Sequence, residues 1–134
     1  MKSYFLKIAA LFIVPVSISL AAAPCNNATL NGRYALLAHG TMYGMNPFNA
    51  VGAIIFDGQG HLTGSGSLID TGSWLEYQSQ GTYFVSRDCS VRIDETPTSS
   101  VSKTQFGMLT NDGKKIFAIA TEEGKNLSFI YEKQ

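Results

Sequence analysis

Short stretches in which apolar and polar residues alternate, each bounded by glycine, recur along the chain beyond residue 23. All 13 glycines lie in that part of the chain, at fairly regular intervals. A period of two places the apolar side chains on one face of a strand, whereas an amphipathic helix repeats every 3.6 residues. Long stretches with the helical period are absent. The pattern therefore predicts an all-β protein.

We expect eight strands, at residues 33–43, 50–56, 61–69, 80–86, 89–94, 101–110, 115–121 and 126–132. Three short segments predict hairpin turns between strands: Asp57-Gly58-Gln59-Gly60, Asn111-Asp112-Gly113 and Glu122-Glu123-Gly124. Glycine accepts the positive φ that such turns require. Three longer connections, at residues 43–49, 70–79 and 95–100, are expected to be surface loops, which often carry binding residues.

Eight short strands joined mostly by hairpins predict an antiparallel up-and-down meander. The 134 residues suffice for one domain. Closure into a small barrel removes the exposed edges of such a meander. The interior of an eight-stranded barrel is either packed with side chains or holds one small ligand. A β-sandwich of the same strands is the alternative.

The first 23 residues have the three parts of a secretory signal peptide. Lys2 and Lys7 form a basic start, residues 8–20 are almost wholly apolar, and Ala21-Ala22-Ala23 is a small-residue exit. The apolar run is too short to span a hydrocarbon layer of about 30 Å comfortably. We expect cleavage near Ala23, a single domain over residues 24–134 and a secreted or periplasmic location.

The charge balance argues against several classes of partner. The whole chain has 10 Lys and Arg against 10 Asp and Glu, and the two lysines before residue 23 would leave with the signal peptide. The remaining 8 basic and 10 acidic residues give a net charge near −2. Nucleic acids and anionic membrane surfaces attract basic patches, so neither is an expected partner.

Cys25 and Cys89 are the two cysteines of the chain. In a secreted protein two cysteines usually form one disulfide. A bridge between them would close a loop of about 64 residues and contribute roughly 3–4 kcal/mol in the chain-entropy model. Lipidation of Cys25 is an alternative that Pro24 disfavours, and two free thiols are another.

Motifs for hydrolytic and metal chemistry are weak in this sequence. Leu68-Ile69-Asp70-Thr71-Gly72-Ser73 resembles the active-site loop of aspartic proteases, which need two such aspartates. The chain has one copy, and a polar turn that ends a strand explains it as well. No Gly-x-Ser-x-Gly, His-x-His or Cys-x-x-Cys motif is present. We expect no metal, no cofactor and, on balance, no enzymatic activity.

Glycines and aromatic residues suggest where a ligand would bind. Gly52, Gly64 and Gly66 leave space on one face of two neighbouring strands, for barrel curvature or for a cavity. The candidate ligand-binding residues are His39, Tyr43, Phe48, Trp74, Tyr77, Tyr83 and Arg92. Tyr34 and Tyr83 are also expected to belong to the core.

Five short segments of the chain form a recognisable combination: Leu30-Asn31-Gly32-Arg33-Tyr34, Val51-Gly52, Phe56-Asp57-Gly58-Gln59-Gly60, Gly81-Thr82-Tyr83 and Asp88-Cys89. Together they resemble a family of small secreted bacterial proteins. The implied architecture is similar to calycin-like or allene-oxide-cyclase-like barrels. The resemblance implies no particular activity and supplies no functional residues.

The expected function is that of a non-enzymatic barrel that binds a small apolar ligand or a protein partner. The alternatives are a cyclase-type barrel enzyme and a protein inhibitor of another enzyme. An apolar ligand calls for a closed cavity of a few hundred Å³. A cyclase calls for a cavity with convergent polar groups such as His39, Arg92 or Tyr83. An inhibitor calls for a packed interior and a protruding loop at 43–49 or 70–79.

Overall fold

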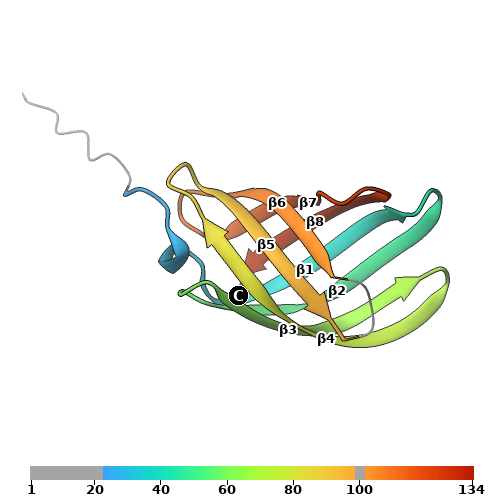
Figure 1. The fold of residues 1–134 in the computed structure, drawn as a ribbon. Helices are drawn as coiled ribbons and strands as arrows, with labels where there is room; N and C mark the ends of the chain where they lie inside the picture. Colours follow the sequence, from blue (N-terminus) through green and yellow to red (C-terminus); the bar gives the residue numbers. More distant parts are fainter. Residues whose placement is uncertain (1–22, 99–101) are drawn as a thin grey trace, which may run out of the picture.

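A computed structural model describes residues 23–98 and 102–134 as one closed antiparallel barrel in which each strand pairs with the next and β8 pairs with β1 (Figure 1). This confirms the predicted all-β meander and its closure. A short 3₁₀ helix, η1 (Asn27–Thr29), precedes the sheet. The strands are β1 (Asn31–Met42), β2 (Asn46–Asp57), β3 (His61–Asp70), β4 (Ser73–Val85), β5 (Ser90–Pro97), β6 (Lys103–Leu109), β7 (Lys115–Ala120) and β8 (Lys125–Lys133).

Two of the predicted loops are strands, and those predictions were wrong. β2 already begins at Asn46 and β4 at Ser73, so the connections shrink to residues 43–45 and 71–72. Pro47 made a strand there look unfavourable. However, Pro47 pairs with Thr41 of β1, whereas the pairing of β2 with β3 begins only at Phe48. The missing N–H of proline is tolerated at such an edge position.

The third expected loop, residues 95–100, is also partly strand. β5 continues to Pro97, so that Glu95 pairs with Lys103 at the start of β6. The alternation of Val91 and Ile93 therefore runs on through Glu95 and Pro97, which are buried as well. Glu95 and Pro97 are residue types that do not suggest a buried strand, so the sequence pattern did not predict that β5 continues here.

One end of the barrel, here called the η1 end, is closed by the N-terminal segment. Cys25 and Cys89 form the predicted disulfide. Leu30 is fully buried, and the hydroxyl of Tyr83 donates hydrogen bonds to the carbonyls of Asn27 and Leu30. The ring of Phe56 makes edge-to-face contacts with Tyr34, Tyr83 and Tyr131, an arrangement that adds to the stabilisation from burial alone. The prediction that Tyr34 and Tyr83 belong to the core is confirmed.

The opposite end, here called the tip end, carries the β1–β2 and β3–β4 hairpin turns together with the β7–β8 turn. Figure 1 shows both long hairpins running to this end, away from η1. The pairing of Phe48 with Asp70 places the ends of the two hairpins side by side. β5 ends and β6 begins at this end as well, at Pro97 and Lys103. The two ends are thus built differently, one closed by η1 and a disulfide and the other formed by turns.

The predicted signal peptide lies outside the described residues apart from Ala23. Within residues 23–98 and 102–134, no helix has the length and apolar character needed to cross a membrane. The disulfide is compatible with an oxidising compartment such as the periplasm or the cell exterior.

Candidate functional site

The barrel separates the residues that the sequence proposed for ligand binding. Phe48, Tyr77 and Tyr83 point into the interior and are at most 6% exposed. Tyr43 and Trp74 lie at the tip end and are about 60% exposed. His39 and Arg92 lie on the outer wall, where Arg92 pairs with Asp94 at 3.0 Å. The polar groups His39, Arg92 and Tyr83 therefore do not converge on one site.

The space left by the strand glycines is occupied by Tyr77. A Cβ on Gly52 would lie 2.9 Å from the Tyr77 hydroxyl, and a Cβ on Gly66 would lie 3.1 Å from the Tyr77 ring. Both glycines also press against the backbone of the neighbouring strand. The glycines therefore let adjacent strands approach closely and let an aromatic ring lie flat on the wall, which agrees with the barrel-curvature interpretation.

A cluster of polar side chains lies inside the barrel towards the tip end, and sequence reasoning found only one of its members. The cluster consists of Tyr77, Ser79, Glu95, Lys103, Gln105 and Tyr131, each at most 8% exposed. The Tyr131 hydroxyl donates to the Gln105 carbonyl at 2.7 Å, and the Gln105 amide donates to Glu95 at 3.4 Å. The Lys103 ammonium lies 4.4 Å from the centroid of the Phe48 ring. The alternation of inward and outward positions along each strand could have identified these side chains as interior. Sequence reasoning missed all but one of them because it expected only apolar residues at inward positions.

Burial changes the acid–base behaviour of this interior polar cluster. Loss of solvation raises the pKa of Tyr77 to about 12, and the nearby Glu95 carboxylate acts in the same direction. Burial likewise raises the pKa of Tyr131. Burial lowers the pKa of the Lys103 ammonium, while the Glu95 carboxylate opposes that shift. The Ser79 hydroxyl is buried without a hydrogen-bond partner among the described residues, which is a cost that native interiors usually avoid.

Large apolar side chains are exposed in the β1–β2 turn and at the start of β4. Tyr43 is 60%, Met45 90%, Trp74 61% and Leu75 40% exposed. Beside Trp74 lies an almost purely apolar hollow of about 170 Å³, lined in part by Val51 and Ile69. Aromatic and methionine side chains are the types most enriched at protein interfaces. These four residues are called the tip residues below.

The turns that present the tip residues are held in an unfavourable backbone conformation. Thr71 and Gly72, the two residues between β3 and β4, have φ values of 49° and 84°. This is the type I′ arrangement that hairpins favour, but a β-branched residue rarely adopts it. Tyr43 also has a positive φ of 47°, and its N–H donates to the carbonyl of Gly124 in the β7–β8 turn. Strain of this kind often marks functional segments.

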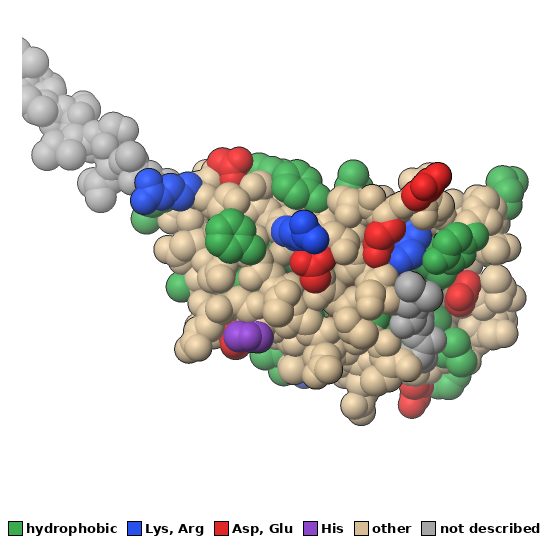
Figure 2. Space-filling view, viewed as in Figure 1, with side chains coloured by type: hydrophobic (Ala, Val, Ile, Leu, Met, Phe, Trp, Pro, Cys, Tyr) green, Lys and Arg blue, Asp and Glu red, His purple; other side chains and the backbone are tan. Residues whose placement is uncertain are grey.

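Charge is distributed unevenly between the two ends. The half-exposed or exposed acids Asp70, Glu76 and Glu123 lie near the tip residues. The two lysines of the tip end are withdrawn from solvent, since Lys103 is 6% exposed and the Lys125 side chain 4%. The exposed Lys and Arg residues among those described lie on the η1 half: Arg33, Arg87, Arg92, Lys114, Lys115 and Lys133. In Figure 2 red side chains accumulate towards the tip end, at the right.

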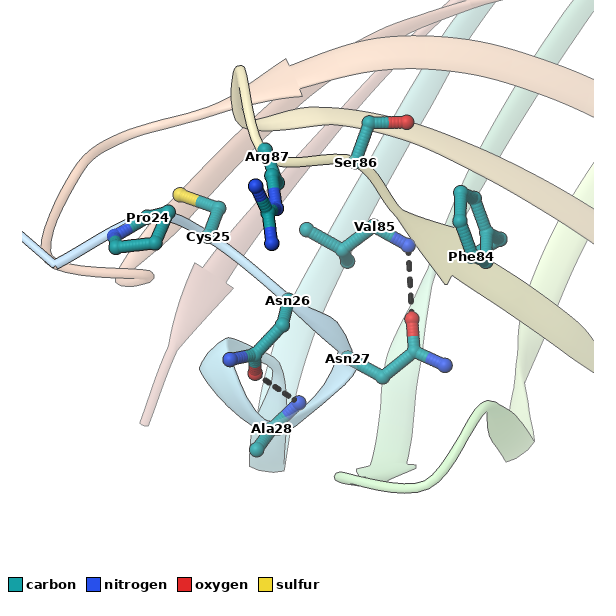
Figure 3. A pocket seen from close by; sticks show the side chains of 9 residues that line it. All are labelled: Pro24, Cys25, Asn26, Asn27, Ala28, Phe84, Val85, Ser86 and Arg87. Carbon is teal, nitrogen blue, oxygen red and sulfur yellow. Dashed lines mark hydrogen bonds between the residues drawn. The ribbon is translucent and has the colours of Figure 1, made fainter.

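The largest hollow found lies at the η1 end and has a structural explanation. It measures about 680 Å³ and is open to solvent between the N-terminal segment and the end of β4 (Figure 3). The Asn27 side chain accepts a hydrogen bond from the Val85 N–H at 2.8 Å, and that of Asn26 accepts from the Ala28 N–H. Asn27 thus fastens η1 to β4 and Asn26 caps η1, so the polar groups of this hollow have structural roles and we do not assign it to a ligand.

The structure also places the motifs that suggested other chemistry. Asp70 is the last residue of β3, and Thr71-Gly72 is the following turn, so the Asp-Thr-Gly-Ser segment is the polar turn that the sequence allowed. Among residues 23–98 and 102–134 there is no group of three or more His, Cys, Asp or Glu side chains arranged to hold a metal ion. Comparison with protein-family models, with curated proteins and with solved structures gives no match.

Proposed function

We propose that the chain is a secreted or periplasmic, non-enzymatic barrel that binds a protein partner with the tip residues. The observation that carries this proposal is the exposure of four large apolar side chains at one end of two adjacent hairpins: Tyr43 and Met45 in the β1–β2 turn, and Trp74 and Leu75 at the start of β4. Isolated exposed apolar residues need no explanation, whereas a group of large ones on adjoining turns is typical of an interaction site.

Charge supports the choice of partner. Asp70, Glu76 and Glu123 surround the tip residues, and the lysines of that end are buried. A complementary surface therefore has an apolar cleft with basic side chains at its rim, because interfaces match opposite charges and thereby gain speed of association and specificity. An enzyme with a basic substrate cleft fits this description, and the chain would then act as its inhibitor.

The barrel interior supports a protein partner over a small apolar ligand. Apolar side chains from all eight strands fill it, and Tyr77 occupies the room beside the glycines. The hollows at the η1 end, beside Trp74 and beside Phe117 are open to solvent, whereas ligand-binding barrels have enclosed pockets. The fold then serves as a rigid base for the two turns.

The interior polar cluster favours a second candidate, a barrel that takes a small polar molecule among Ser79, Glu95 and Lys103. The unpartnered Ser79 hydroxyl is the observation in its favour. Native mass spectrometry of the protein as exported by its own host tests it, because a retained molecule adds a discrete mass. A Ser79→Ala variant that loses this mass would support the second candidate.

The proposed function is tested by affinity capture from the medium and periplasm of the host, with three forms of the protein as bait. We expect the unaltered chain to retain one partner and the double variant Tyr43→Ala, Trp74→Ala to lose it at least about tenfold, as for residues that dominate an interface. Phe84→Ala is the matched control, because Phe84 is an aromatic residue that is 62% exposed at the other end of β4.

Salt adds a second criterion to this capture experiment. Attraction between exposed charges is screened within about 10 Å at 0.1 M salt, so binding should weaken as salt is raised. A partner that the double variant retains, or that only the Phe84→Ala variant loses, contradicts the proposal. Capture of no partner by the unaltered chain contradicts it equally.

A further inference from the structure

A second apolar surface lies on the outer wall of the barrel and meets the tip end at Val51, which also lines the hollow beside Trp74. The strand register aligns five outward side chains in one row across five adjacent strands: Met108 of β6, Phe117 of β7, Ile130 of β8, Leu37 of β1 and Val51 of β2. Phe106 and Ile119 form a second row beside it. These seven residues are called the outer belt. At about 4.8 Å between strands, the row is about 19 Å long.

The outer belt is exposed to an unusual degree. Six of its residues are between 46% and 58% exposed, and Ile130 is half-buried. A half-exposed Phe offers about 100 Å², and the aliphatic side chains and Ile130 offer less, so the belt offers on the order of 500 Å² of apolar surface. This lies in the upper part of the range of about 300–600 Å² that the largest apolar patch on a typical monomer covers. One side of a standard protein interface covers about 800 Å², so the belt would supply the greater part of such a contact.

The opposite outer wall has a different character. Outward residues of β3 and β4 are mostly Thr, Ser and Gln, for example Thr63, Ser65, Gln78 and Gln80. Figure 2, which views the barrel from the side of β3 to β6, shows a surface dominated by tan, with green side chains scattered over it. An apolar exterior is therefore not a general property of this barrel. The belt is restricted to the strands from β6 through β8 to β2.

We propose that the outer belt is the contact surface between two copies of this chain. One end of the belt is hollow, since about 400 Å³ lies among Phe106, Met108 and Phe117 together with Ile119 and Ile130. The other end carries Leu37 and Val51, which are 46% and 57% exposed, and Val51 also lines the hollow beside Trp74. Ile130 is the middle residue of the row, so a two-fold axis there would place Phe117 of one copy against Leu37 of the other, twice.

The charges near the belt fit the same partner. None of the seven belt residues is charged, and the border next to Phe117 and Ile130 holds Lys115 and Glu132, whose side chains lie 3.5 Å apart. A border that carries both a positive and a negative charge can face the same border of a second copy. A foreign partner whose rim carried charges of a single sign would meet a like charge there. The proposal goes beyond the proposed function, because none of the belt residues is a tip residue and only Val51 lines the hollow beside Trp74. A dimer therefore leaves two sets of tips available.

Light scattering on the chain, expressed from its complete sequence and recovered as the host processes it, measures the mass in solution. At a protein concentration of about 100 µM, at which even weak specific dimers form, we expect twice the monomer mass. Phe117→Glu should raise the dissociation constant at least about tenfold, because it buries an unpaired charge. Ser65→Glu, an outward position on β3, is the matched control and should remain dimeric.

A pair of charge variants tests the predicted pairing of Leu37 with Phe117 of the other copy. Phe117→Lys and Leu37→Glu should each be monomeric alone, and an equimolar mixture should restore the dimer mass, since one contact becomes an ion pair and the other stays apolar. Recovery in the mixture also shows that both variants are folded. A monomeric unaltered chain, a Phe117→Glu variant that stays dimeric, or a mixture that stays monomeric overturns the proposal.

One further variant separates this proposal from the function of the tip residues. Met45→Ala, at a tip residue that is 90% exposed and does not line the hollow shared by Val51 and Trp74, should leave the dimer mass unchanged. Loss of the dimer in that variant would place the contact at the tips and overturn the belt proposal. A monomer that nevertheless cross-links to a foreign protein through position 117 would also overturn it, while leaving the proposed function of the tip residues intact.

Discussion

At the scale of single residues, the barrel requires glycine at certain strand positions and a large aromatic ring beside them. Gly52 and Gly66 pair with each other across β2 and β3 at a point where backbone meets backbone. Tyr77 then covers both glycines, so that one large ring replaces several smaller side chains. Packing at this point of the interior therefore requires glycine at positions 52 and 66 and a large ring at position 77.

The first prediction concerns Gly66. A Cβ at this position would clash with the carbonyl of Val51 and lie 2.7 Å from Cα of Gly52, and neither backbone atom can move without shifting a strand. Gly66→Ala should therefore lower the free energy of unfolding by about 1–3 kcal/mol. Urea denaturation measures this, with Ser65→Ala on the outer face as the control. Equal stability of both variants would show that the strands are less tightly apposed than described.

The second prediction concerns Tyr77 and alkaline pH. Its pKa is about 12 in the folded chain against 10.0 ordinarily, so the folded state retains a proton that the unfolded state loses between these values. The stability contributed by Tyr77 is complete below pH 10 and is lost as pH rises to 12. Tyr77→Phe should flatten the fall in unfolding free energy over this interval.

Urea denaturation between pH 8 and 11.5 checks the prediction. The unaltered chain, measured over the same interval, gives the reference slope. A slope unchanged in Tyr77→Phe would mean that Tyr77 ionises in the folded state as readily as in the unfolded one.

At the scale of elements, the two ends of the barrel differ in what they are built for. η1, the disulfide and the aromatic contacts of Phe56 close one end. The other end combines strained turns, exposed aromatics and a buried polar cluster, none of which favours stability. Elements that cost stability are commonly retained where they serve binding, which supports placing the function at the tip end.

The disulfide yields the third prediction. It joins residues 64 apart in the sequence and ties the N-terminal segment to the start of β5. Replacement of both cysteines by serine should lower the free energy of unfolding by roughly 3–4 kcal/mol, mainly because the unfolded chain gains freedom. Urea denaturation of the double variant and of the unaltered chain gives the difference directly. A difference below about 1 kcal/mol would mean that the N-terminal segment is held by its hydrogen bonds and packing instead.

The β3–β4 turn yields the fourth prediction. Asn-Gly suits a type I′ turn, whereas Thr71 adopts its φ of 49° at a cost. Thr71→Asn should therefore raise the free energy of unfolding by about 1 kcal/mol. Thr63→Asn, at an exposed position within β3, should not stabilise the chain. If Thr71→Asn is neutral or destabilising, the turn is not strained and loses its value as a sign of function.

Much of this fold could be predicted from the sequence because alternation and glycine turns are local signals. Eight strands, three hairpin turns and the disulfide follow from residues close together or from cysteine count alone. The first residues of β2 and β4 could not be predicted. Whether Pro47 lies in a strand, or Thr71 in a tight turn, depends on the strand that pairs with it. The buried Glu95 and Lys103 were missed for the same reason, because only pairing across strands makes an inward charge tolerable.

At the scale of the whole molecule, the barrel carries two apolar surfaces that meet at the hollow between Val51 and Trp74. The tip residues gather at one end among acidic groups, and the outer belt covers the wall from β6 to β2. The dimer that we propose would present two sets of tips, and linked sites can raise overall binding far above that of one site. The two proposals together would make the molecule a bivalent binder.

Photo-cross-linking in the native host tests the central claim, that the tip end binds a protein, most directly. A photoreactive amino acid replaces Trp74 in one variant and Phe84 in the other, two aromatic positions that are 61% and 62% exposed on the same strand. The account predicts one discrete adduct with a foreign protein from position 74 and none from position 84. Adducts of equal yield from both positions, or no adduct from position 74, would contradict it.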